Sequence, residues 1–244
     1  MLLRYPLESA AGIVILWLLF IGIFFGAKSI SGAPISPERL TPLVLGYCLW
    51  FFAIIMLNSV AYELMNEAAQ GTLEQLALTR RPGLITVVLI RSLTSFAFGL
   101  ISVSILLLLI MATTGLWLSF PLGQSFLLVL LSVAVLAGIS LLLGGLALIF
   151  KRVGQVVALT QFLLLLVAFS PPEMLGRLSQ PVKFLLPLAG GVELLSRLTT
   201  GAGPVRAEEW LMMTLAALIY LVVGGTLFLV AERVARRHGL LGHY

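Results

Sequence analysis

The stretch Leu84–Thr113, LITVVLIRSLTSFAFGLISVSILLLLIMAT, decides the fold class of this chain. Arg91, near its start, is its only charged residue. A helix needs roughly 20 mostly apolar residues to cross the hydrocarbon core of a bilayer. Because this run exceeds that length, we expect a membrane-spanning helix that tilts or projects beyond the core.

Five further apolar runs lie on either side of this stretch. The whole chain is 60% hydrophobic and 10% charged, with a mean hydropathy of +1.13, which no soluble domain could bury. The sequence therefore predicts an all-α membrane protein with six transmembrane helices, forming a single domain over residues 1–244. The other five predicted spans are Ala10–Ala27, Leu43–Ala61, Phe126–Phe150, Val156–Ser170 and Trp210–Ala231.

Loop charges indicate the orientation. With both termini in the cytoplasm, nine of the fifteen Lys and Arg residues lie on the cytoplasmic side. They include Arg80 and Arg81 between the second and third spans, and a basic cluster, Arg233, Arg236 and Arg237, after the last span. Since short cytoplasmic loops carry an excess of basic residues, we expect both termini to be cytoplasmic.

The composition also excludes several functions. All ten acidic residues are Glu, which argues against metal and phosphoryl-transfer sites that depend on aspartate. The chain has no phosphate-binding loop of the form G-x4-G-K-[ST], so we expect no ATPase site and no enzyme activity. Cys48 is the single cysteine and His238 and His243 lie in a basic tail, so we expect neither a disulfide within the chain nor a metal site. The net charge of +5, carried at segment ends, suits lipid headgroups rather than nucleic acid.

A polar insert, Glu63–Pro82, separates the second and third spans. Thr72 followed by Gln75 forms a capping box. Glu74 then lies in the first turn of the predicted helix, and basic residues occupy the last, each at the favourable end of the helix dipole. The sequence therefore predicts a two-turn amphipathic helix over Gly71–Arg81. Its apolar face consists of Leu73, Leu76 and Ala77.

Two interpretations of this insert remain open. It is either a solvated loop whose helix rests on lipid, or a helix that fills a socket in a cytosolic partner and transmits motion. Glu63 and Glu67, one turn apart, either fix the angle of the second span by pairing with Arg80, Arg81 or Arg91, or mark where that helix leaves the membrane.

Mildly polar residues and glycines dot the spans, and they too allow two interpretations. They favour close helix packing, or they line a translocation path for an amphipathic or lipid-like cargo. The candidate path residues are Asn58, Ser59, Tyr62, Ser95, Ser102, Thr160 and Gln161. The candidate packing glycines are Gly138, Gly144, Gly145, Gly224 and Gly225.

The segment Pro171–Glu209 is too polar to span the bilayer. Within it, Phe184–Leu198 is apolar enough to enter the membrane surface, so we expect a short interfacial or re-entrant helix before the sixth span.

Two motifs resemble a known family. Glu63-x3-Glu67-x3-Gly71-Thr72-Leu73-Glu74-x-Leu76-x2-Thr79, between the second and third spans, resembles the signature of ABC-2 type permeases, the membrane subunits of ATP-driven exporters. Leu186-Pro187-Leu188-x3-Val192-Glu193-Leu194-Leu195-x-Arg197-x3-Gly201 is similar to the family's stretch between spans five and six. With the six spans and the basic tail, the resemblance covers nearly the whole chain.

The resemblance implies a coupling helix that seats in a groove of a separate nucleotide-binding ATPase. Two copies of that ATPase would bind ATP and Mg, and a second permease copy or a paralogue would complete a dimer. It also implies an outer gate at Pro187, Glu193 and Arg197. The residues implied in coupling are Glu63, Glu67, Gly71, Thr72, Leu73, Glu74, Gln75, Leu76, Arg80 and Arg81.

The implied function is export of a hydrophobic or amphipathic substrate (drug, lipid, natural product or lipid-linked molecule) from the cytoplasm or inner leaflet. The implied location is the inner (plasma) membrane of a prokaryote. A non-transporting membrane scaffold and an intramembrane lipid-modifying enzyme are the alternatives.

Overall fold

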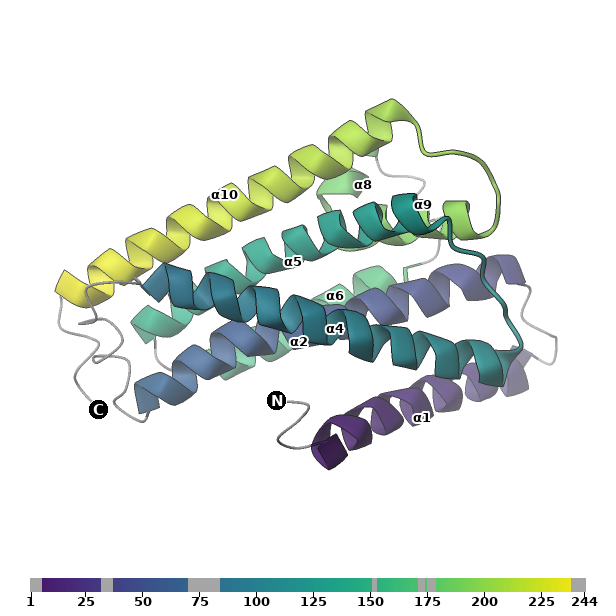
Figure 1. Ribbon diagram of the computed structural model, residues 1–244, viewed down its shortest axis with the longest axis horizontal. Helices are drawn as coiled ribbons and strands as arrows, with labels where there is room; N and C mark the ends of the chain where they lie inside the picture. The colour runs from purple at the N-terminus through teal and green to yellow at the C-terminus, as the bar shows by residue number, and fades with distance from the viewer. Residues whose placement is uncertain are drawn as a thin grey trace.

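The computed structural model describes residues 6–31, 37–69, 84–150, 153–170, 174 and 179–237, and every regular element in these ranges is a helix. Figure 1 shows the long helices side by side, with α10 along one edge of the bundle and α1 along the other. The helices are α1 (Pro6–Ser31), α2 (Pro37–Ala69), α4 (Leu84–Thr114), α5 (Leu122–Phe150), α6 (Gly154–Ala168), α8 (Gln180–Leu185), α9 (Ala189–Thr199) and α10 (Ala207–Arg237).

Four of these helices are long and apolar enough to cross a membrane, which makes the chain a multi-pass helical membrane protein. The crossing segments are Arg39–Glu67, Thr86–Thr114, Leu122–Phe150 and Ala207–Arg237. Two shorter apolar helices, Ala10–Gly26 and Gly154–Ala168, correspond to the predicted first and fifth spans. The all-helical membrane fold is thus confirmed, while the count of six spans stays a prediction.

The predicted spans and the observed helices differ most in α2. The apolar run ends at Ala61, yet the helix continues to Ala69. Hydropathy marks the part of a helix that lies in hydrocarbon, whereas backbone hydrogen bonding continues through polar residues such as Glu63 and Glu67. At its other end α2 begins at Pro37 and contains Pro42.

Helix α2 is the centre of the bundle. Of its most apolar window 72% is buried, against 28% for α4 and for α10, and Phe52 and Met56 are almost fully enclosed. The outer helices expose large apolar side chains instead, among them Leu93 and Val222. Apolar surface on this scale is stable only in contact with lipid or another apolar partner, which agrees with a fold that lies in a membrane.

Close packing of α5 against α10 depends on glycine. A Cβ atom added at Gly224 would collide with the carbonyl oxygen of Gly138, and one at Gly138 with the carbonyl oxygen of Tyr220. Gly144 and Gly145 likewise face neighbouring helices, so the packing interpretation is confirmed for these four glycines. It is wrong for Gly225, where an added Cβ atom would meet nothing within 4 Å.

The segment predicted as a single interfacial helix, Phe184–Leu198, is two helices. α8 ends at Leu185 and α9 begins at Ala189, with a turn between them. In that turn Leu188 has a φ of 70°, in the left-handed region that non-glycine residues rarely adopt. Proline has no N–H group to continue a helix, so the break falls at Pro187. α9 also packs against α2 and α5, so it belongs to the bundle.

Candidate functional site

Three charged side chains tie the end of α2 to the beginning of α4, and we call Glu63, Glu67 and Arg91 the charged joint. The Nε atom of Arg91 lies 3.3 Å from Oε2 of Glu63, and its Nη2 atom donates a hydrogen bond to Oε1 of Glu67. The two glutamates are four residues apart and therefore share one face of α2. A single guanidinium thus bridges both carboxylates, an arrangement that its forked donors favour.

The joint is partly buried. The exposed fraction is 17% for the Glu67 side chain, 25% for Arg91 and 35% for Glu63. Partial burial strengthens charge–charge attraction relative to water, and it makes an unpaired charge costly. The joint therefore fastens α2 to α4 close to the points where both helices meet residues 70–83.

The joint resolves part of one sequence hypothesis. Of the three arginines considered as partners for Glu63 and Glu67, the structure places Arg91 against both. Arg80 and Arg81 lie outside the described residues. The remaining predicted coupling residues lie outside them as well, namely Gly71, Thr72, Leu73, Glu74, Gln75 and Leu76.

Two of the predicted path residues meet between α2 and α6. Nε2 of Gln161 donates to Oδ1 of Asn58 at 2.7 Å, and Nε1 of Trp50 donates to the backbone carbonyl of Gln161 at 2.8 Å. This polar contact bridges two helices. The hydroxyls of Ser59 and Thr160 instead donate to backbone carbonyls of their own helices. A path along these residues stays a prediction.

The predicted gate residues belong to two ion pairs at the other end of the bundle, where α8, α9 and the start of α10 lie (Figure 1). Nζ of Lys183 on α8 lies 2.6 Å from Oε2 of Glu193 on α9. Arg197 on α9 pairs with Glu209 on α10, and Oε2 of Glu209 also accepts the backbone N–H of Arg206 at 2.8 Å. Pro187 lies in the turn between α8 and α9. α9 is thus linked by ion pairs to both α8 and α10.

Sequence reasoning missed three residues here. Lys183 has a side chain only 6% exposed, although the sequence alone assigned it no role. Glu209 and the buried Glu232, whose carboxylate pairs with Arg236 one turn later at 2.6 Å, were not singled out either. The sequence did hold one indication for Lys183, which lies between two apolar residues: a lysine that is buried with such neighbours is almost always paired.

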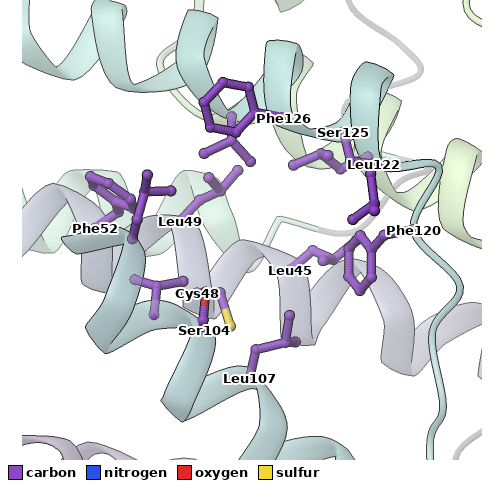
Figure 2. Close-up of a pocket in the computed structure, with 14 residues that line it drawn as sticks. Leu45, Cys48, Leu49, Phe52, Ser104, Leu107, Phe120, Leu122, Ser125 and Phe126 are labelled. Atoms are coloured by element: carbon purple, nitrogen blue, oxygen red, sulfur yellow. The ribbon is translucent and has the colours of Figure 1, made fainter. Parts of the chain in front are cut away.

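A cavity of about 290 Å³ lies between α2, α4 and α5 (Figure 2). Its lining is almost entirely apolar, with Cys48, Ser104 and Ser125 as the exceptions. None of the seven predicted path residues lines it.

Within the described ranges, no group of three or more His, Cys or acidic residues is arranged to hold a metal ion. A comparison of the chain with protein-family models, with curated proteins and with solved structures finds no match.

Proposed function

We propose that this chain is the permease subunit of an ATP-driven exporter for a hydrophobic or amphipathic substrate. The observation that supports the proposal best is the position of the charged joint. It lies about two turns from either end of residues 70–83, whose sequence predicts an amphipathic helix that docks on a partner. A helix that transmits force from a partner needs a rigid connection to the helices next to it, and the two carboxylates bridged by Arg91 supply that connection.

In this proposal two cytoplasmic ATPase subunits, which bind ATP and Mg, press on Gly71–Arg81 as they close. Because the joint fastens α2 to α4, the push moves both helices together. α2 is the most buried helix, so its tilt alters the packing of the whole bundle. The chain would act with a second permease copy or a paralogue, and its first and fifth spans would be α1 and α6.

The far end of the bundle completes the mechanism. The pairs Lys183–Glu193 and Arg197–Glu209 hold α9 between α8 and α10. Opening an outward path requires α9 to move relative to at least one of these neighbours, so the two ion pairs would act as the outer gate. The apolar interior favours an uncharged or amphipathic cargo over an ion.

The proposal is tested by purifying the tagged protein from membranes of its own host in a mild detergent and measuring Mg-ATP hydrolysis of the eluate. Three samples are compared: wild type, Glu74→Arg in the predicted coupling helix, and Glu208→Arg as a matched control. Glu208 is exposed in the first turn of α10, at the opposite end of the bundle, so its variant carries the same charge change away from the coupling segment.

We expect ATPase activity with wild type and Glu208→Arg, and its loss with Glu74→Arg. Equal activity in all three samples would place the ATPase contact elsewhere. No ATPase activity in any sample would remove the exporter proposal and favour a membrane scaffold.

A further inference from the structure

We propose that the cavity between α2, α4 and α5 binds one acyl chain of a bilayer lipid, with the ester group of that lipid near Ser125. This inference does not depend on the proposed export function, since a lipid can occupy the cavity of a transporter or of a scaffold alike.

The cavity lies inside the membrane-spanning part of the fold. Its walls run from Leu45 to Phe52 on α2, from Leu100 to Leu107 on α4, and from Leu122 to Val129 on α5. At about 1.5 Å of rise per residue, each wall is roughly 10 Å long. The cavity therefore extends along the helix direction for a length that can take up part of an extended acyl chain.

The chemistry of the walls excludes water and favours hydrocarbon. An apolar cavity of about 150 Å³ stays dry and takes up benzene or xenon, and this one holds about 290 Å³. An empty cavity of this size forfeits the dispersion contacts of its lining. A lipid chain, present at high concentration around α4 and α5, supplies those contacts without removing a polar group from water.

The cavity has a lateral entrance. α4 and α5 touch each other little, while both pack on α2. Ser104 on α4 and Phe126 on α5 line the cavity and are themselves exposed, so they stand at its rim (Figure 2). Both helices expose apolar side chains to the surrounding hydrocarbon, so a chain enters sideways from the bilayer.

Ser125 sets the expected position of the lipid. It lies in the first turn of α5, lines the cavity and is only 6% exposed, and its hydroxyl oxygen has no hydrogen-bond partner among the described residues. The exposed Trp117, shortly before α5, is typical of the membrane–water interface. An ester carbonyl at this level would accept the orphaned hydroxyl proton after rotation of the Ser125 side chain.

The test uses the full chain in nanodiscs made only of synthetic phosphatidylcholine, a fraction of which carries a photoreactive diazirine on one acyl chain. One probe has the diazirine near the ester and another has it near the middle of the acyl chain, because a cavity roughly 10 Å long holds only part of an extended chain. After irradiation, the adducts are mapped by mass spectrometry. We expect the first probe to label the Leu122–Ser125 end of the cavity, and the second to label Phe52 and Leu100.

Two variants place the same extra ring on α4. Ser104→Phe fills the rim of the cavity, and Thr94→Phe adds the ring at an exposed position that does not line it. We expect Ser104→Phe to lose the cavity adducts and to keep those on exposed residues such as Leu159, whereas Thr94→Phe retains both. Ser125→Ala should weaken labelling by the ester-proximal probe.

The proposal is overturned if wild type shows no cavity adducts, or if both probes label the cavity without regard to depth. It is likewise overturned if cavity adducts appear only when a free photoreactive fatty acid is added, since that would identify a different hydrophobic ligand. The wild-type depth pattern stays decisive even if Ser104→Phe fails to fold.

Discussion

Replacing Arg91 by methionine tests the charged joint most directly. The substitution keeps much of the apolar stem of the arginine and removes the guanidinium that Glu63 and Glu67 share on one face of α2. Exposed ion pairs contribute about 0–1 kcal/mol to stability, whereas removing one partner of a buried pair costs about 3–5 kcal/mol. The joint lies between these limits, so we expect Arg91→Met to lower the free energy of unfolding by about 2–3 kcal/mol.

Burial predicts an order among the three members of the joint. Glu67 is the most enclosed, so Glu67→Gln should cost about 2 kcal/mol, as expected for hydrogen bonds to charged groups. Glu63 has a side chain 35% exposed and lies 3.3 Å from the guanidinium, so Glu63→Gln should cost less than about 1 kcal/mol. The triple variant that neutralises all three residues removes both signs of charge together, and should therefore be less destabilised than Arg91→Met.

The assay is unfolding of the purified protein in mixed micelles by increasing sodium dodecyl sulfate, followed by helical circular dichroism. Arg233→Met serves as the control, because Arg233 is an exposed arginine on α10 towards the same end of the bundle. The reasoning is refuted if Arg91→Met is no less stable than this control. It is also refuted if the triple variant is as unstable as Arg91→Met alone.

Two further predictions use the same assay. Gly224→Ala forces a Cβ atom against the carbonyl oxygen of Gly138 and should cost about 1–3 kcal/mol of stability. Gly225→Ala, at the next position, has open space and should be neutral or stabilise the protein by up to about 1 kcal/mol. The reverse order of stability would contradict the α5–α10 packing. Glu193→Gln leaves the nearly buried ammonium of Lys183 unpaired and should cost about 3 kcal/mol of stability. Lys183→Met leaves the Glu193 carboxylate, whose side chain is 35% exposed, and should cost about 1 kcal/mol. Equal losses would show that burial does not govern this pair.

The fold was predictable wherever apolar length and helix signals coincide. α4 was expected from Leu84 to Thr113 and ends at Thr114, because Pro82 and Gly83 precede the run and Gly115, with a φ of 72°, follows it. α2 was predicted too short, because its last turns are helical but polar. The turn between α8 and α9 was missed, although Pro187 marks it, because hydropathy alone gives Phe184–Leu198 as one continuous apolar segment.

The candidate site was predictable in its residue types and not in its partners. Spacing placed Glu63 and Glu67 on one face of α2, but three arginines were equally available to them in the sequence. The choice of Arg91 depends on how α4 packs against α2, which is a tertiary property. The same holds for Lys183, whose partner Glu193 lies on a different helix, and for the cavity, which exists because α4 and α5 diverge while both rest on α2.

Helix α2 is held to its neighbours by bonds of unequal strength, and this inequality bears on the proposed mechanism. Towards α4 it has the charged joint, in which the bond of Arg91 to the more enclosed Glu67 contributes about 1.5–3 kcal/mol. Towards α6 it has two neutral bonds, Asn58–Gln161 and Trp50–Gln161, and such bonds between membrane helices average about 0.6 kcal/mol each. A push on residues 70–83 should therefore move α2 with α4 and separate it from α6 first. The neutral triple variant of the joint should remove this preference at a smaller loss of stability than Arg91→Met. If the exporter proposal holds, that variant should still hydrolyse ATP while exporting less substrate for each ATP consumed, and an unchanged ratio would mean that the joint only stabilises the fold.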